Sequence, residues 1–247
     1  LIQTACSLIS AGTERSGLRL ARKNIIGKAA SRPDLVKKVW EKARTEGIKE
    51  AYLQSMGRLD TPVSLGYSCS GRVIEAGDGV DQLRTGDRVA CFGAGWASHA
   101  EVNFVPQNLA VPVPHGLGDE EAAFAGVGAI ALHGVRQLGA GIEDVAVVIG
   151  LGLLGLLSVQ ILKAGGARVV GYDPDEKKVA IARRLGADYA AAAEEDIGEA
   201  VRKLSGGAGA DAAIIMAAAD SPRPLEFAAE LCRPKATIAV PGLVGLT

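Results

Sequence analysis

The sequence predicts an α/β protein with two parts, a β-rich N-terminal part and a C-terminal part built on a doubly wound parallel sheet. From residue 119 onward, strand-like apolar runs alternate regularly with helical segments, which is the pattern of parallel strands joined by crossover helices. Within this part, the run 146–149 ends in a glycine-rich turn that opens directly into an apolar helical segment. Residues 61–113 instead form short strand-like runs separated by glycines, which favours a barrel-like β region.

Composition narrows the function classes. The 247 residues are enough for a full core, and the 32 glycines suit a fold with many tight turns. A net charge of −1 argues against a dedicated binder of nucleic acid or anionic membrane. The four cysteines lack C-x-x-C spacing, so we interpret them as buried thiols. With no apparent signal peptide or bilayer-length apolar run, we expect a reducing, cytoplasmic location.

The N-terminal elements follow in order. Residues 1–9 predict a strand, and residues 10–14 predict a turn. Residues 15–60 form a basic insert with a local charge of +7 and two predicted helices, at 35–43 and 48–56. This insert is either a solvated surface or a lid or docking face for an anionic partner. Residues 87–92 predict a strand, and the proline-rich connection 111–117 marks the expected boundary between a first domain, 1–117, and a second, 118–247.

The second domain is predicted element by element from its periodicity. A helix with small residues is expected at 120–138. Strands are expected near 145–150, 167–172, 187–190, 211–217 and 236–241, and helices near 153–164, 175–185, 194–204 and 222–231. The first residues resemble a strand already under way, and the last follow a strand-like run, so both domains are expected to be incomplete in this chain.

The glycine turn fits the dinucleotide-binding fingerprint G-x-G-x-x-G. Gly150 allows the tight turn, Gly152 lets the backbone approach a pyrophosphate, and Gly155 lets the helix lie close to the strand. The N-terminus of the helix offers N–H groups and a positive dipole end to the phosphates. Asp173 ends the next strand, where a carboxylate can bind the ribose hydroxyls of NAD and repel the 2′-phosphate of NADP.

Several segments together resemble the medium-chain dehydrogenase/reductase family, the zinc alcohol dehydrogenase-like superfamily. The resemblance covers nearly the whole chain, and the basic insert with residues 10–14 more narrowly resembles the N-terminal unit of bi-domain oxidoreductases. The matching segments are 66–73, 77–80 with 86–89, 121–123 with 131–133, 150–155 and 185–188.

The resemblance implies a GroES-like catalytic domain, a Rossmann domain and an active site in the cleft between them. It also implies a homodimer formed through edge strands of the Rossmann sheet, and the narrower resemblance implies a second dehydrogenase-like domain fused at the C-terminus. A small-molecule substrate is expected, with neither a nucleic acid nor a membrane as partner.

The chain departs from the family at the zinc ligands. The matching positions hold Ala11, Tyr67 with Ser68, and Gly126. Alanine and glycine side chains have no donor atom, and neutral hydroxyl groups are poor zinc ligands compared with thiolate, imidazole or carboxylate. The four-cysteine structural zinc lobe is missing too. His99, His115 and His133 lack the spacing of a replacement site, and we interpret each as a surface or packing residue. We therefore expect no zinc.

Other site residues are carried over from the resemblance. Thr13 matches a position that relays a substrate proton, and Tyr67 and Ser68 would bring hydroxyl groups into the place of the metal, although Tyr67 can also simply fill that space. Phe92 and Trp96 would line the substrate pocket, or pack in the core. On the cofactor side, we expect Gly150, Leu151, Gly152, Leu153, Leu154 and Gly155 at the pyrophosphate, Asp173 and Lys178 at the ribose, and Gly242 near the nicotinamide.

The predicted function is a zinc-independent, NAD(H)-dependent oxidoreductase that moves hydride to or from a small polar alcohol or ketone, with a sugar derivative as one candidate. One alternative is an NADPH-dependent enone or quinone reductase, against which Asp173 argues. A second alternative is a nucleotide-binding scaffold module that has lost catalysis, which the missing metal site and the basic insert motivate.

Overall fold

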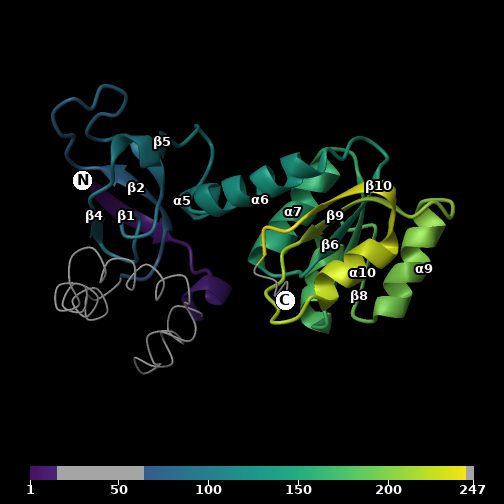
Figure 1. Ribbon diagram of the computed structural model, residues 1–247. Coiled ribbons are helices and arrows are strands. Elements are labelled where there is room, and N and C mark those ends of the chain that lie inside the picture. Colours follow the sequence, from purple (N-terminus) through teal and green to yellow (C-terminus); the bar gives the residue numbers. More distant parts are fainter. Residues whose placement is uncertain (16–63, 243–247) are drawn as a thin grey trace, which may run out of the picture. The chain divides into compact units, whose positions relative to one another are not determined.

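The computed structural model describes residues 1–15 and 64–242 (Figure 1). They fall into two compact units, which divide between Phe124 and Ala125. This division falls shortly after the boundary expected behind residue 117. The two helices predicted in the basic insert lie outside the described residues.

The first unit contains a five-stranded antiparallel sheet with the order β4-β1-β2-β3-β5. Among the described residues, its apolar core is centred on Ile2, Cys69, Val73, Val89 and Cys91. The predicted strand at 1–9 ends at Ser7. The elements of the unit are β1 (Ile2–Ser7), β2 (Ser68–Val73), β3 (Arg88–Phe92), β4 (Val102–Asn103), η1 (Gln107–Leu109), β5 (Ala110–Pro112) and α5 (Asp119–Ala122).

The second unit is built on a five-stranded parallel sheet with the order β10-β9-β6-β7-β8. Numbered within this unit, the order is 5-4-1-2-3, the order of the Rossmann dinucleotide-binding fold. Its strands are β6 (Val145–Ile149), β7 (Arg168–Tyr172), β8 (Tyr189–Ala191), β9 (Ala210–Ile215) and β10 (Cys232–Ala239), and its helices are α6 (Ala125–Leu138), α7 (Leu153–Ala164), α8 (Glu176–Arg184), α9 (Glu194–Leu204) and α10 (Arg223–Leu231).

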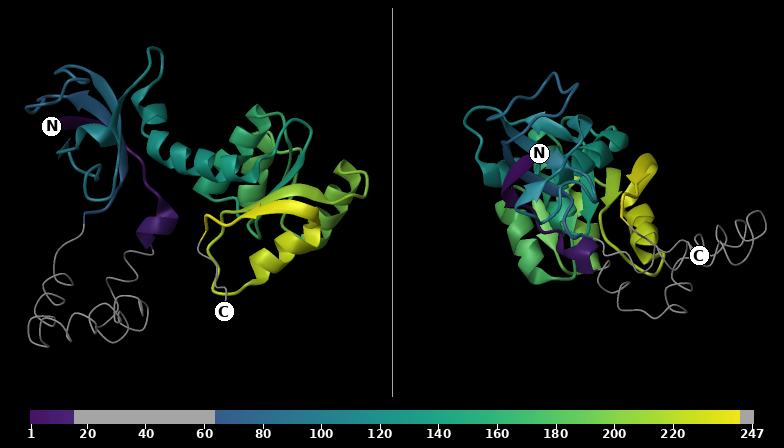
Figure 2. Two further views of the ribbon diagram at one scale, coloured as in Figure 1. Left: turned by 45° about the horizontal axis from the view of Figure 1, so that its top comes forward. Right: turned by 90° about the vertical axis from the view of Figure 1, so that its left-hand side faces the viewer.

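Helices cover both faces of this sheet, as a doubly wound fold requires. Helices α6, α7 and α8 pack on one face, where Val159 and Val179 join the core. Helices α9 and α10 pack on the other through Ile197 and Phe227. Figures 1 and 2 show α7 and α10 on opposite sides of the strands. The sheet is buried on both faces because its strands are continuous apolar runs, as at β6, all of whose residues are buried.

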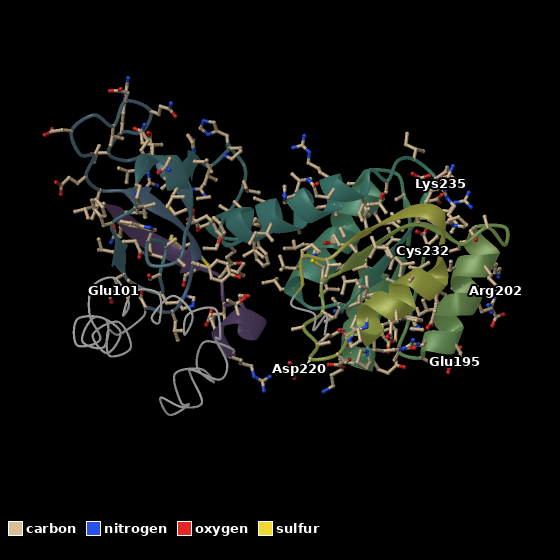
Figure 3. All side chains as sticks on the ribbon, in the orientation of Figure 1. Glu101, Glu195, Arg202, Asp220, Cys232 and Lys235 are labelled. Atoms are coloured by element: carbon tan, nitrogen blue, oxygen red, sulfur yellow. The ribbon has the colours of Figure 1, made fainter. Side chains whose placement is uncertain are left out.

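Two elements differ from the prediction. The helix expected at 120–138 is divided into α5 and α6, and the Ala123 carbonyl at the division accepts a hydrogen bond from Ser68 Oγ at 2.7 Å. Strand β10 begins earlier than expected, at Cys232 directly after α10 (Figure 3). Its pairing with β9 shifts register between Cys232 and Thr237, where Lys235 adopts a φ of 69°.

Within the two described stretches, no helix combines the length and the apolar character needed to cross a bilayer.

Candidate functional site

The glycine turn after β6 has a backbone that only glycine fits. Gly150 has a φ of +93°, and a Cβ there would lie 2.6 Å from the Ala217 nitrogen. Its own N–H donates to the Tyr172 carbonyl at 2.7 Å, which holds the turn against the end of β7. A Cβ on Gly155 would collide with the Gly150 carbonyl oxygen, so α7 passes directly over the turn. Gly150 and Gly155 therefore have the steric roles of the first and third glycines of the fingerprint, which are to allow the tight turn and the close packing of helix on strand.

Gly152 lies between them. A Cβ at this position would meet no atom of residues 1–15 or 64–242 within 4 Å. Gly152 is the N-cap of α7; in the part of the chain that the structure describes, no side chain caps this helix, and its first turn carries no acidic residue. The unpaired N–H groups of a helix N-terminus and its positive dipole end attract anions. Gly152 and the first turn of α7 therefore fit a pyrophosphate group at the N-terminus of this helix.

Asp173 closes the turn from the neighbouring strand. It is buried, with 5% of its surface exposed. Its Oδ2 accepts the Leu151 N–H at 2.9 Å, and its Oδ1 accepts the Asp175 N–H at 3.0 Å. Because the Leu151 N–H is donated to Asp173, the N–H groups that can face phosphates begin at Gly152. Asp173 therefore has a structural role in addition to any contact with a ribose.

Lys178 supplies the countercharge to Asp173. Its Nζ lies 3.1 Å from both carboxylate oxygens, and 42% of its side chain is exposed. Lys178 reaches Asp173 from the first turns of α8, whose N-cap is Asp175. A ribose hydroxyl that binds Asp173 would compete with this flexible ammonium group rather than with the backbone donors.

Gly242 lies at the same edge of the sheet. Its N–H donates to the Ile215 carbonyl at 2.9 Å, and a Cβ there would collide with the Ala217 carbonyl oxygen. Ala217 thus lies against both Gly150 and Gly242, a convergence that sequence spacing could not reveal. The carboxyl ends of the strands of an open α/β sheet are where ligands bind. The structure brings the predicted cofactor residues together at this edge.

In the first unit, Tyr67, Ser68 and Phe92 lie together where β2 begins and β3 ends. The Tyr67 and Phe92 rings form an edge-to-face pair with centroids 5.8 Å apart. Ser68 is opposite Phe92 in the sheet and is 1% exposed. Its hydroxyl is donated to the Ala123 carbonyl, so it already has a structural partner.

Trp96 and Thr13 have other neighbours. The Trp96 ring pairs with Phe104 at 5.9 Å and is 41% exposed. Thr13 is exposed on a helical turn at residues 11–15, and its Oγ1 accepts a hydrogen bond from Ser10 Oγ at 3.3 Å. No ring contact joins Trp96 to Phe92 in the part of the chain that the structure describes.

The positions that match zinc ligands do not fit a zinc ion. Ala11 and Gly126 carry no donor atom, and the Ser68 hydroxyl is committed to a backbone carbonyl. Among residues 1–15 and 64–242, no three His, Cys, Asp or Glu side chains are grouped so that they could hold a metal ion.

Sequence reasoning missed a polar cluster formed by Ser7, Glu14 and His99. His99 Nδ1 lies 3.0 Å from Ser7 Oγ, and Nε2 lies 3.1 Å from Glu14 Oε1. No local pattern could have revealed it, because Ser7 and His99 are 92 positions apart.

Two family models match the chain in succession. The alcohol dehydrogenase GroES-like domain matches residues 40–116, and the zinc-binding dehydrogenase domain matches residues 154–247. Together they span most of the chain.

Curated relatives and solved structures agree with these matches. A D-guloside 3-dehydrogenase of Escherichia coli is 34% identical over 152 residues, which cover 61% of this chain and 43% of that protein. A sorbitol dehydrogenase of Halalkalibacterium halodurans is 29% identical over 180 residues, which cover 61% and 52%. This chain thus spans about half the length of these relatives.

An alcohol dehydrogenase of a Thermus species superposes on this chain with a TM-score of 0.66 at 24% identity. The superposition covers 72% of this chain and 61% of that one, and it shows that the two share a fold. The protein AibC superposes with a TM-score of 0.63 at 27% identity, over 72% and 62%.

Proposed function

The chain belongs to the medium-chain dehydrogenase/reductase superfamily, and we propose that it is a zinc-independent oxidoreductase that uses NAD(H) to interconvert a small polar alcohol and its ketone. The observation that carries the proposal is the open cradle at Gly152 with the buried Asp173 carboxylate beside it. The sugar and polyol dehydrogenases among the relatives support a sugar or polyol derivative as substrate.

Each cofactor residue has a physical role in this proposal. The first N–H groups of α7 would bind the pyrophosphate, and Gly152 lets the backbone approach it. An Asp173 oxygen would accept a ribose hydroxyl, and its negative charge would repel a 2′-phosphate, which favours NAD(H) over NADP(H). When bound, the nicotinamide supplies the hydride chemistry.

Hydroxyl groups of the first unit would handle the proton of the substrate alcohol. The Thr13 hydroxyl accepts from Ser10, so its own proton can be donated to a substrate oxygen. The Tyr67 phenol is half-buried and held by Phe92, which limits its motion. A donor fixed beside a developing alkoxide stabilises it without reorganisation. Zinc independence is supported by Ala11 and Gly126, which cannot ligate a metal.

The test is titration of the metal-free protein with NADH and with NADPH, followed by nicotinamide fluorescence, for the wild type, Asp173→Asn and Lys178→Met. We expect the wild type to bind NADH at least ~10-fold more tightly than NADPH, a difference of about 1.4 kcal/mol. Asp173→Asn should remove most of this preference. The melting temperature is measured in parallel because Asp173 also holds the Leu151 N–H.

Other outcomes would replace the proposal. Tighter binding of NADPH than of NADH would favour an enone or quinone reductase. A folded protein that binds neither nucleotide would favour a scaffold module. If binding follows the expected pattern, activity is measured on a panel of polyols and sugars with and without a chelator, and loss of activity with the chelator would contradict zinc independence.

A further inference from the structure

The imidazole of His99 connects three segments of the first unit that are distant in sequence. Nδ1 lies 3.0 Å from Ser7 Oγ at the end of β1, and Nε2 lies 3.1 Å from Glu14 Oε1 on the helical turn at residues 11–15. The backbone N–H of His99 donates to the Leu65 carbonyl at 2.9 Å, in the segment that leads into β2. One residue therefore contacts β1, the turn that carries Thr13 and the segment that carries Tyr67.

The partners define how the ring is bonded. An ionised Glu14 carboxylate is an acceptor only, so Nε2 must carry the proton that joins the two groups. In the neutral ring Nδ1 is then an acceptor, and it takes the hydroxyl proton of Ser7. Both ring nitrogens thus form hydrogen bonds, and the ring has a single orientation in which both bonds can form.

Gly66 makes room for this ring. The φ of Gly66 is +89°, and a Cβ there would lie 2.7 Å from the backbone nitrogen of His99 and 2.9 Å from its ring atoms Cγ and Nδ1. The imidazole therefore packs directly on the backbone of the residue before Tyr67. Such a close contact fixes the ring relative to the Tyr67 segment as well as to Glu14.

Glu14 extends the connection to Thr13. Its Oε1 also accepts the Ser10 N–H at 3.0 Å, where the helical turn begins. The Ser10 hydroxyl in turn donates to Thr13 Oγ1 at 3.3 Å. The side chains of Glu14 and His99 are 13% and 25% exposed, so water competes only partly with their contact. Both ends of the turn are thus held through one carboxylate.

We propose that His99 and Glu14 are a positioning pair that holds the Thr13 hydroxyl in register with the Tyr67 segment. Neither residue touches the substrate. They act by fixing the turn that carries Thr13, and this inference rests on the proposed role of Thr13 in proton transfer. A displacement of about 1 Å at a reacting group can cost on the order of 10²-fold in rate.

Four single variants test the hydrogen bonds between His99 and Glu14. His99→Phe keeps a ring and removes both ring hydrogen bonds, whereas His99→Gln keeps an amide donor for Glu14. Glu14→Ala removes the acceptor, whereas Glu14→Gln keeps a carbonyl oxygen. The matched control is His115→Phe, which changes an exposed histidine of the same unit. The double variant His99→Phe with Glu14→Ala measures coupling.

We expect enzyme kinetics and amide hydrogen exchange to give the same answer. His99→Phe and Glu14→Ala should each lower kcat by ~10- to 100-fold with the KM for NADH unchanged. The glutamine variants should recover part of the loss, and the double variant should be no worse than the worse single one. Independently of activity, amide hydrogen exchange should quicken at residues 10–15 and stay unchanged at residues 145–149 in the second unit.

The exchange measurement separates failure of this inference from failure of the proposed function. Exchange at residues 10–15 that is unchanged, or that quickens equally throughout the first unit, would overturn the positioning pair. Independent, multiplicative losses of kcat would do the same. If the wild type shows no oxidoreductase activity, the proposed function fails, and coupled local exchange alone decides whether the pair positions the turn.

Discussion

At the scale of single residues, three glycines of one turn have different physical reasons to be glycine. Gly150 has a backbone conformation and a neighbour, Ala217, that exclude a side chain, and Gly155 lies against the Gly150 carbonyl. A Cβ added at Gly152 would meet no atom of the described residues within 4 Å. The requirement at Gly150 and Gly155 therefore comes from the fold, and any requirement at Gly152 comes from a ligand.

This contrast predicts that stability and binding separate between two alanine variants. Gly155→Ala should lower the free energy of unfolding by about 1–3 kcal/mol, because backbone must move to admit the Cβ. Gly152→Ala should leave the unfolding free energy nearly unchanged and weaken NADH binding at least ~10-fold. Urea unfolding and fluorescence titration measure the two quantities. A Gly152→Ala protein that binds NADH like the wild type would contradict a pyrophosphate at this point.

At the scale of elements, two carboxylates hold neighbouring parallel strands of the second unit in register. Asp188, just before β8, accepts the Val169 N–H of β7 at 2.6 Å and pairs with Lys163. Asp211, in β9, accepts the Val145 N–H of β6 at 2.8 Å and pairs with Arg233. Each carboxylate thus binds a backbone donor at the start of the adjacent strand, outside the regular ladder.

These bonds make the stability of the unit sensitive to acid. Burial by itself would raise the pKa of Asp188 and of Asp211, but hydrogen bonds from the basic side chain and the backbone N–H outweigh it, so both pKa values are lowered. A carboxyl group whose pKa is lower in the folded state stabilises the fold above its unfolded pKa, ~3.9. That contribution disappears as the pH falls through the folded pKa.

We therefore predict that Asp188→Asn and Asp211→Asn each lower the unfolding free energy at pH 7 by about 1–2 kcal/mol. The difference from the wild type should shrink as the pH falls below about 4. Urea unfolding between pH 7 and pH 3 measures it, with Glu199→Gln on the exposed face of α9 as control. A difference that stays constant with pH would show that the lost bonds do not depend on ionisation.

At the scale of the whole molecule, the two units have separate hydrophobic cores. The core of the first unit consists of residues from the antiparallel sheet and its loops, and the two cores of the second unit lie on either face of the parallel sheet. The predicted cofactor residues all belong to the second unit, whereas Thr13, Tyr67 and the His99–Glu14 pair belong to the first.

This separation predicts that NADH stabilises the units unequally. A ligand at 100 times its dissociation constant stabilises the state that binds it by about 2.7 kcal/mol. At that concentration, amide exchange that requires unfolding of the second unit should slow accordingly at residues 145–149, and exchange at residues 88–92 should slow much less. Equal slowing at both strands would show that the units unfold as one cooperative body.

Local patterns were enough to predict the second unit almost element by element. Apolar strand runs and amphipathic helices repeat there with short connections, and most consecutive strands are also neighbours in the sheet, the exception being β8 and β9. The fingerprint glycines and Asp173 could be predicted for the same reason, because the motif lies in one strand–turn–helix and the end of the next strand. The division between α5 and α6 was not predicted, because the Ala123 carbonyl is capped by Ser68, 55 positions away.

The sequence by itself determined the fold class, the glycine turn and the acidic residue beside it, because each depends on residue type and short-range spacing. Only the tertiary structure decided that Asp173 also holds the turn, that Ala217 lies against both Gly150 and Gly242, and that His99 joins Ser7 to Glu14. The physical reason is that hydrogen bonds and close contacts form between segments that only folding brings together. A histidine without a motif can be interpreted only when its partners are in place.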